Sequence, residues 1–174
     1  MMYTMNEINE MHQSEFVRTI GTVFEDSPWV AELSWKHHPF DSLEQLHFNM
    51  THEMIEANTS LQLSLLRAHP DLGTKLAVSE ASRQEQQGVG LAALSKDEYL
   101  EFSTLNKKYV TNFGFPFIMA VKGQSKDKIL VQMKKRQFNS YESEMETALY
   151  EVSKIAKFRL TDMIINKKTG KMGS

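Results

Sequence analysis

The sequence predicts an all-α fold, with a single compact domain of about seven or eight helices over residues 1–165. Three observations favour it: apolar residues recur at three- and four-residue spacing, helix-start and helix-stop signals are frequent, and strand signals are nearly absent. The one apolar run without helical spacing covers residues 115–121, and the sequence offers no obvious partner strand for it. The polar residues 166–174 are expected to form a tail or the start of a linker.

The first half of the chain contains three predicted helices. Ser27-Pro28 starts the first, because serine is a good N-cap and proline fits the first helical position. Asp41-Ser42 opens the second, and Thr59 is expected to cap a shorter third helix that ends near Arg67. One face of the second helix carries Leu43, Leu46, Met50 and Met54.

The second half contains three more. Ser95 and Glu98 form a capping box for a helix that should end at Gly114, a typical C-terminal glycine. A further helix is expected from Ser125 to about Phe138. The last and longest runs from about residue 141 to residue 165.

The composition excludes several classes of protein. The chain has 174 residues, and its net charge of −2 lacks the basic excess that a general nucleic-acid binder needs. The absence of cysteine excludes disulfides, thiolate catalysis and cysteine-ligated metals. No apolar run approaches the roughly 20 residues of a membrane span. We therefore expect a soluble cytoplasmic protein whose acid–base groups are His, carboxylates, Lys, Arg or Tyr.

The last predicted helix carries an arginine on its apolar face. Arg159 lies three residues after Ala156 and four before Met163, within the apolar stripe. A buried guanidinium needs a partner, because an unpaired buried charge costs several kcal/mol. Arg159 therefore forms a structural ion pair, extends its stem toward solvent, or faces a ligand.

His69-Pro70 marks a second candidate. The proline disfavours helical conformation in the preceding residue, so the helix from Thr59 should end at His69. A histidine at this position can project into a cleft, and the ordinary pKa of histidine suits proton transfer. The alternative is a histidine that is favoured there only by the helix dipole.

Two further segments are candidates for a binding site. Ser82 and Glu85 have capping-box spacing, which is equally typical of an exposed helix start. Residues 113–117 hold three of the ten phenylalanines. Aromatic side chains beside irregular backbone can form a pocket wall, or they can simply pack in the core. No HExxH motif occurs, so no metal site is predicted. The sequence also has no phosphate-binding glycine loop.

Taken together and in this order, these segments resemble the 2-oxo-4-hydroxy-4-carboxy-5-ureidoimidazoline (OHCU) decarboxylase family of urate degradation. The resemblance covers about residues 8–165, and only the ordered set is specific. The segments that carry it are residues 24–32 (FEDSPWVAE), 69–73 (HPDLG), 82–86 (SRQEQ) with Gly90-Leu91, Leu105-Asn106 with Tyr109, residues 113–118, and residues 151–160.

The resemblance implies an all-helical carboxy-lyase that needs no cofactor, forms homodimers and converts OHCU to (S)-allantoin. The implied catalytic residues are His69, Glu85 and Arg159. The implied substrate-binding residues are Pro70, Ser82, Arg83, Gln84, Glu85, Gln86, Phe117, Ile118, Met119, Ala120 and Val121. The departures are small: Asp71 stands where Glu is also common, and Gly73-Thr74 where Ala-Gly is frequent.

Other functions remain open at this point. A helical binding module would use residues 113–117 against a partner, and His69 and Glu85 would then lie far apart. A hydrolase acting on 5-hydroxyisourate is disfavoured, because enzymes for that step have β-rich folds. In some bacteria the domain is fused ahead of a urate oxidase, and residues 166–174 would suit such a junction.

Overall fold

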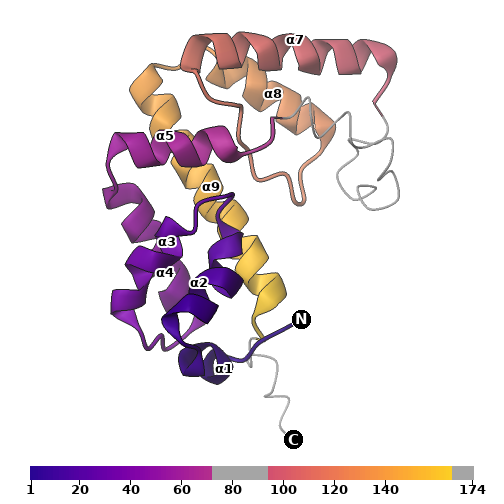
Figure 1. Cartoon of the computed structure of the whole chain (residues 1–174). Coiled ribbons are helices and arrows are strands. Elements are labelled where there is room, and N and C mark those ends of the chain that lie inside the picture. The colour runs from indigo at the N-terminus through magenta and orange to yellow at the C-terminus, as the bar shows by residue number, and fades with distance from the viewer. Residues whose placement is uncertain (72–93, 166–174) are drawn as a thin grey trace, which may run out of the picture. The chain divides into compact units, whose positions relative to one another are not determined.

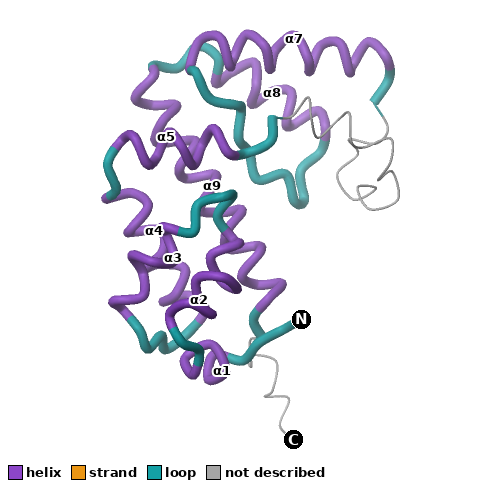
Figure 2. The backbone as a smooth tube through the Cα atoms, in the orientation of Figure 1, coloured by secondary structure: helices purple, strands orange, loops and turns teal. Residues whose placement is uncertain are grey.

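The computed structural model describes residues 1–71 and 94–165. Within these residues the chain forms eight α-helices and two short 3-10 helices, and its one β-bridge joins Tyr3 to Ile164 (Figures 1 and 2). The all-α prediction is confirmed. The apolar run 115–121 is an irregular connection, drawn in teal in Figure 2, and not a strand.

The chain divides into two compact units, Met1–Leu65 with Ser153–Ser174, and Leu66–Val152. A single domain over residues 1–165 stays a prediction, and residues 166–174 lie outside the described residues. The first unit contains α1 (Met5–Glu10), α2 (Gln13–Ile20), the 3-10 helix Gly21–Val23, α3 (Trp29–Ser34), the 3-10 helix Trp35–His37 and α4 (Leu43–Glu56). Two helices belong to both units: α5 (Thr59–Ala68) and α9 (Tyr141–Met163).

Aromatic rings and a backbone clasp hold the first unit together. The ring of Phe16 lies 5.2 Å from that of Trp35 and 5.4 Å from that of Phe40. At the chain start, the Tyr3 amide donates to the carbonyl of Met163 over 2.7 Å, and the Tyr3 carbonyl accepts from Ile165 over 2.8 Å. The N-terminal segment is thereby fastened to the end of α9.

A buried carboxylate stabilises the same unit. Glu53 of α4 accepts from Lys36 over 2.8 Å and from His37 over 3.0 Å. Burial alone would raise the pKa of Glu53, but these two donors outweigh it and lower the pKa below its ordinary value. The folded state therefore favours the ionised form of Glu53.

The second unit is built around α7 (Lys96–Phe113), α8 (Lys126–Arg136) and the first part of α9. Helices α7 and α8 lie side by side (Figure 1), joined by ion pairs of Lys126 with Glu98 at 3.0 Å and Lys134 with Glu101 at 2.7 Å. Fully or nearly fully buried side chains between the helices of this unit are Phe102, Tyr109, Ile129, Met133 and Ala148.

Most of the predicted helix ends are confirmed. Ser42 accepts from the amide of Gln45 at the start of α4, and Ser95 and Glu98 form the full capping box of α7. Gly114 ends α7 in the left-handed region, with φ at 75°. Local hydrogen bonding fixes these ends, which is why a local sequence signal is sufficient to place them.

Two predicted caps are wrong by one residue. Pro28 is the N-cap of α3, and the hydroxyl of Ser27 donates to the carbonyl of Glu25 instead of accepting from the helix. At α5, the side chain of Asn58 accepts from the amide of Leu61, and Thr59 is already helical. In both cases the N-cap is the residue next to the predicted one, and only Asn58 caps its helix with a side-chain hydrogen bond.

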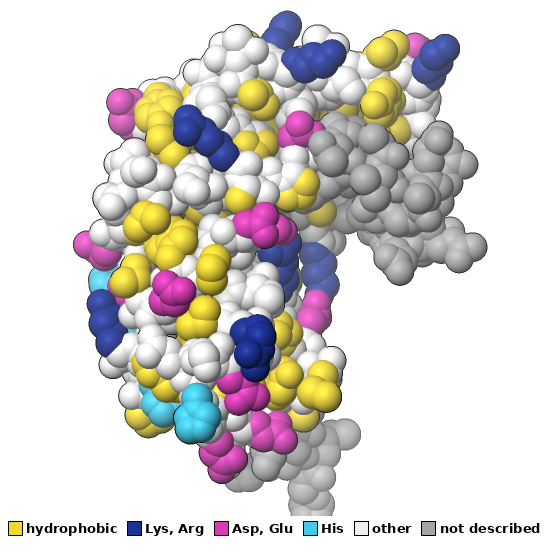
Figure 3. Space-filling model, in the orientation of Figure 1, with side chains coloured by type: hydrophobic (Ala, Val, Ile, Leu, Met, Phe, Trp, Pro, Cys, Tyr) yellow, Lys and Arg dark blue, Asp and Glu magenta, His cyan; other side chains and the backbone are white. Residues whose placement is uncertain are grey.

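The surface mixes the two signs of charge. On the face shown in Figure 3, acidic and basic side chains are interspersed over the described residues and do not gather by sign. This distribution agrees with the near-neutral net charge. None of the described helices is long and apolar enough to cross a membrane.

Candidate active site

His69, the predicted catalytic histidine, directly follows the last residue of α5. The helix ends at Ala68, and His69 donates its backbone N–H to the carbonyl of Leu66 over 3.3 Å. Pro70 follows, so the helix ends where the sequence predicts. His69 is 6% exposed, whereas Pro70 lies at the surface. An imidazole that is largely shielded from bulk water is suited to exchange a proton with a bound molecule.

The phenylalanine-rich segment packs in the core of the second unit. Phe113, Phe115 and Phe117 are buried, and their rings lie around that of Tyr109 at centroid distances of 4.6, 6.0 and 5.4 Å. The backbone beside these rings is irregular from Gly114 onward. Core packing is therefore confirmed for this segment, and its use as a pocket wall stays a prediction.

The predicted substrate-binding segment 117–121 has backbone donors without an acceptor among residues 1–71 and 94–165. Phe117, Ile118 and Ala120 are buried, and Met119 is half-buried. Among the hydrogen bonds of the described residues, none is donated by a backbone amide of residues 117–120. Buried N–H groups in proteins are nearly always paired, with ligand or water where the chain supplies no acceptor. Binding of a ligand by these amides stays a prediction.

A hydrogen bond joins the end of α5 to the phenylalanine-rich segment 113–117. Arg67, two residues before His69, donates its Nε–H to the carbonyl of Gly114 over 3.0 Å. Both residues belong to the second unit. The histidine-proline turn and the aromatic segment are thus linked by a hydrogen bond from the side chain of Arg67 to the backbone of Gly114.

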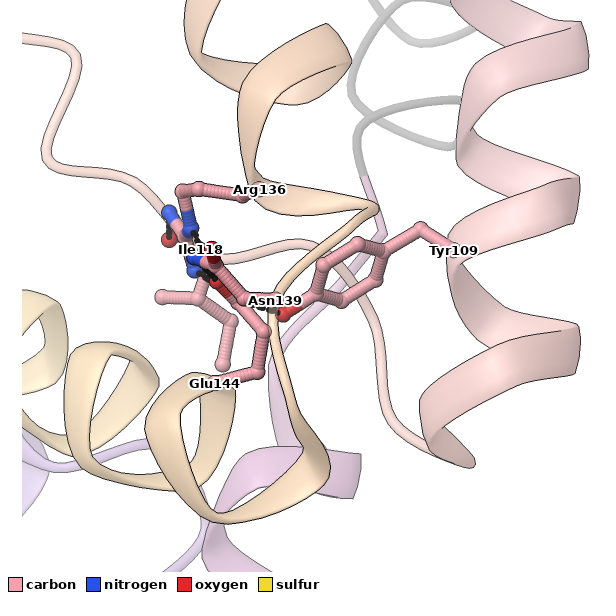
Figure 4. Close-up of polar contacts among 5 residues, drawn as sticks. All are labelled: Tyr109, Ile118, Arg136, Asn139 and Glu144. Carbon is pink, nitrogen blue, oxygen red and sulfur yellow. Dashed lines mark hydrogen bonds and ion pairs between the residues drawn. The ribbon is translucent and has the colours of Figure 1, made fainter.

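A buried ion pair contacts the first two residues of the segment 117–121, and Figure 4 shows it beside Ile118. Arg136, the last residue of α8, binds Glu144 of α9 through Nε and Nη2, with the Nη2–Oε2 distance at 2.9 Å. The side chains are 5% and 0% exposed. The Nη1 of Arg136 donates to the carbonyl of Ile118 over 2.8 Å, and the guanidinium lies 4.4 Å from the ring centroid of Phe117. One cation therefore contacts two consecutive residues of the predicted binding segment.

Two more donors complete the environment of Glu144. The hydroxyl of Tyr109 donates to it through a short hydrogen bond, and the side-chain amide of Asn139 donates over 2.9 Å. Burial, together with the bond to Glu144, raises the pKa of Tyr109 well above its ordinary value, so the phenol stays protonated. The carboxylate is fully hydrogen-bonded, which is the condition for a stable buried charge.

Arg159 makes an ion pair within the first unit. Its Nη2 binds the carboxylate of Glu25, and its Nη1 donates to the carbonyl of Val23 over 3.2 Å. The side chain of Arg159 is 37% exposed and that of Glu25 26%. The partner that the sequence predicted for Arg159, without identifying it, is therefore Glu25 of the FEDSPWVAE segment. Both side chains remain partly exposed to solvent.

The remaining predicted site residues cannot be placed. Ser82, Arg83, Gln84, Glu85 and Gln86 lie outside the described residues, so the predicted proximity of His69 and Glu85 stays a prediction. In the described part of the chain, no group of three or more His, Asp and Glu side chains is arranged to hold a metal ion.

Sequence reasoning missed the Arg136–Glu144 pair, although a signal was present. Arg136 follows Ile129 and Met133 at seven and three residues, so helical spacing places it on the apolar face of α8. Glu144 precedes Ala148 by four residues and shares its buried face of α9. The same reasoning that singled out Arg159 applies to both residues, but spacing alone does not identify the partner.

The chain matches one protein family over most of its length. The family is described as OHCU decarboxylase, and the match covers residues 9–161. The Halalkalicoccus jeotgali protein named 2-oxo-4-hydroxy-4-carboxy-5-ureidoimidazoline decarboxylase is 41% identical over 93% of this chain and 92% of that protein.

A second relative is a larger protein. The Bacillus subtilis uric acid degradation bifunctional protein PucL is 44% identical over 95% of this chain but 34% of its own length, so the chain spans about a third of it. Among solved structures, a crystal structure of (S)-allantoin synthase has a TM-score of 0.78 at 29% identity, covering 93% of this chain and 54% of that one.

Proposed function

We propose, from the premise that this chain belongs to the OHCU decarboxylase family, that it decarboxylates OHCU to (S)-allantoin in urate degradation. The observation that carries the proposal is the match to that family over residues 9–161, which includes His69-Pro70 and the segment 117–121. The reaction is a carbon–carbon lyase step that uses acid–base groups of the chain and no cofactor.

The substrate itself supplies the electron sink. When the bond to the carboxylate breaks, its electron pair moves toward the adjacent imine of the ring, and carbon dioxide leaves. A proton is then added to the carbon that bears the ureido group, while the ring hydroxyl becomes a carbonyl. Most decarboxylases borrow a cofactor to hold such an electron pair. A conjugated imine removes that need.

His69 is the acid–base group in this proposal. It engages the hydroxyl or carboxylate side of the substrate and manages the proton as carbon dioxide leaves. Its burial directly after a helix end, with Pro70 fixing the turn, supports this role because a fixed imidazole delivers a proton to one face only. Delivery from one face gives a single enantiomer of allantoin.

The segment Phe117 to Val121 binds the planar amide edges of the substrate. The amides of residues 117–120, which have no acceptor among the described residues, support this role, since the ring and ureido carbonyls of OHCU are good acceptors. The buried phenylalanine rings beside them exclude water from the reacting atoms. Pro70 and residues 82–86 complete the substrate contacts, with Glu85 orienting His69 or accepting from ureido N–H groups.

Arg159 binds a substrate oxygen. A grip on the leaving carboxylate would stabilise the ground state more than the transition state and would slow the reaction. The charge is better used on a ring carbonyl or on the delocalised anion, where negative charge develops. The partial exposure of Arg159 supports this role, because the guanidinium retains access to molecules outside the protein.

The proposal also covers the location, the oligomeric state and the domain organisation of the protein. We propose a cytoplasmic homodimer, and a domain that can be joined to a urate oxidase, as the family resemblance implies. The match to about a third of a bifunctional uric acid degradation protein supports the last point. Light scattering on purified protein tests the dimer, and a mass of one chain would contradict it.

The activity has a direct test. OHCU is generated from urate by urate oxidase and a hydroxyisourate hydrolase, and circular dichroism follows the appearance of (S)-allantoin. We expect the chain to accelerate formation of this enantiomer over the spontaneous decay, which yields both. A rate and an enantiomer ratio equal to those without the chain would overturn the proposed function.

A further inference from the structure

We infer that Arg136 is a positioning residue for the proposed reaction, because it fixes the orientation of the peptide groups in the segment Phe117 to Val121. The inference rests on the proposed function, which makes that segment a substrate-binding element. Arg136 touches no substrate in this account. It acts through the backbone of Ile118 and the ring of Phe117.

The guanidinium of Arg136 donates hydrogen bonds to two groups, the Glu144 carboxylate and the Ile118 carbonyl. Nε and Nη2 face the Glu144 carboxylate, and Nη1 donates to the Ile118 carbonyl at 2.8 Å. Figure 4 shows the guanidinium of Arg136 pointing toward both Glu144 and Ile118. Because a guanidinium is planar and its donors are fixed in direction, locking two of them on Glu144 also fixes the direction of the third.

The consequence for the segment follows from peptide geometry. In a trans peptide the carbonyl of one residue and the N–H of the next lie in one plane and point in opposite directions. With the Ile118 carbonyl held toward Arg136, the amide of Met119 must point away from the buried pair. Met119 is half-buried, and its amide is one of those without an acceptor in the described residues. Arg136 therefore presents this donor to the binding site.

The other side chains around the Arg136–Glu144 pair form a cluster with it: Tyr109, Asn139 and Phe117. They hold the arginine in its orientation. Tyr109 and Asn139 also donate hydrogen bonds to the Glu144 carboxylate, and these bonds hold the carboxylate in its orientation toward Arg136. The Phe117 ring lies 4.4 Å from the guanidinium and 5.4 Å from the Tyr109 ring, nearly perpendicular to the latter. Two neighbouring residues of the segment are thus held from the same side.

An ion pair is not the simplest way to fill this space. Apolar residues of similar volume often stabilise a fold as well as a buried pair, because they avoid the desolvation penalty. They have no donor for the Ile118 carbonyl, however. The charge is therefore explained by the orientation of the segment rather than by core packing alone.

The test compares variants that keep or neutralise the buried charge. Arg136→Lys keeps a cation beside Glu144, but a single ammonium cannot reproduce the planar fork that reaches both Glu144 and Ile118. Arg136→Met/Glu144→Gln removes both charges and leaves an acceptor for Tyr109, so no unpaired charge is buried. If the lysine variant does not fold, the double variant carries the test.

Met54→Ala is the control for stability, because Met54 is fully buried in the first unit and lies in neither the segment nor the cluster. For each chain, kcat and KM for OHCU are measured together with the Kd for (S)-allantoin, at a temperature where circular dichroism shows the fold intact.

We expect both Arg136 variants to raise KM and the allantoin Kd by about 10-fold or more, the size of one well-placed hydrogen bond, while Met54→Ala lowers Tm and leaves both constants within about 2-fold. Constants within about 2-fold of wild type in a folded Arg136 variant would overturn the inference, because Arg136 would then serve stability alone. A wild-type chain that forms no (S)-allantoin above the spontaneous rate would overturn the proposed function, and the inference with it.

Discussion

The guanidinium of Arg159 is paired and yet partly exposed, which separates its two possible roles experimentally. Its ion pair with Glu25 reaches solvent, so the pair contributes little to stability, about 1 kcal/mol or less. If Arg159 also binds a substrate oxygen, removing its side chain should lower kcat/KM much more than it lowers the free energy of unfolding.

Arg159→Met is therefore expected to lower kcat/KM by about 10-fold or more and to change the free energy of unfolding by about 1 kcal/mol or less. Steady-state kinetics and urea denaturation check the two parts. Lys157→Met, at an exposed position of the same helix, is the control for loss of one positive charge. An unchanged kcat/KM would contradict substrate binding by Arg159 and leave the ion pair with Glu25 as its role.

Glu53 makes the stability of the protein depend on pH in a defined direction. Its pKa is lowered in the folded state, because the hydrogen bonds from Lys36 and His37 outweigh the effect of burial. The ionised form is thus favoured by folding. Its contribution is complete above the ordinary glutamate pKa of 4.5 and is lost as the pH falls through the lower, folded-state value.

We expect Glu53→Gln to lower Tm at pH 7 and to lose this difference from wild type progressively below about pH 4.5. Thermal unfolding followed by circular dichroism between pH 7 and about pH 3 measures it. Glu56→Gln, an exposed carboxylate of the same helix, should leave the pH dependence of Tm unchanged. A Tm difference for Glu53→Gln that is the same at both ends of the range would contradict this account.

At the scale of the element, the end of α7 determines where the binding segment begins. Gly114 adopts φ of 75°, and its carbonyl accepts from Arg67. A Cβ at this position would meet its nearest atom, Nη2 of Arg67, at an ordinary contact distance of 3.8 Å. The cost of a side chain here is therefore conformational and not steric.

Gly114→Ala should lower the free energy of unfolding by about 1 kcal/mol, because alanine is strained in the left-handed region. Gly114→Asn should cost less, since asparagine tolerates that region better. Urea denaturation of the two variants in parallel gives the comparison. Equal stability of the alanine variant and wild type would show that the left-handed turn does not limit stability.

Local signals predicted the helices well where the hydrogen bonds are local. Ser42 and Ser95 start helices and Gly114 ends one as the sequence indicates, because the capping hydrogen bond of each is made with a residue no more than four positions away. The first two helices were not predicted, although Thr4 and Glu7 form a capping box that starts α1. Helices of six and eight residues carry too few turns for a periodic apolar pattern to stand out.

At the scale of the whole molecule, composition excluded classes of protein but identified none. The ordered set of segments indicated the family, and the match over residues 9–161 now shows that membership. The position of His69 after a helix end was predictable, because Pro70 follows it. Spacing could place Arg136 on a buried face but could not choose its partner, since Glu144 and Tyr109 approach it from separate helices. Nor could a pattern reveal that the amides of residues 117–120 have no acceptor within the described part of the chain.

In the proposed decarboxylation one buried histidine, His69, carries the proton chemistry. His69→Asn keeps a polar side chain of similar size, so we expect the far-ultraviolet spectrum to match that of wild type. His52→Asn, at an exposed histidine of α4, is the matched control and should keep full activity.

The most direct measurement is circular dichroism that follows OHCU breakdown by these chains. We expect the folded His69→Asn variant to lose enzyme-dependent formation of (S)-allantoin by about 100-fold or more, the usual contribution of a general acid–base group. A full enzyme-dependent rate and enantiomer ratio in that variant would contradict the assignment of His69.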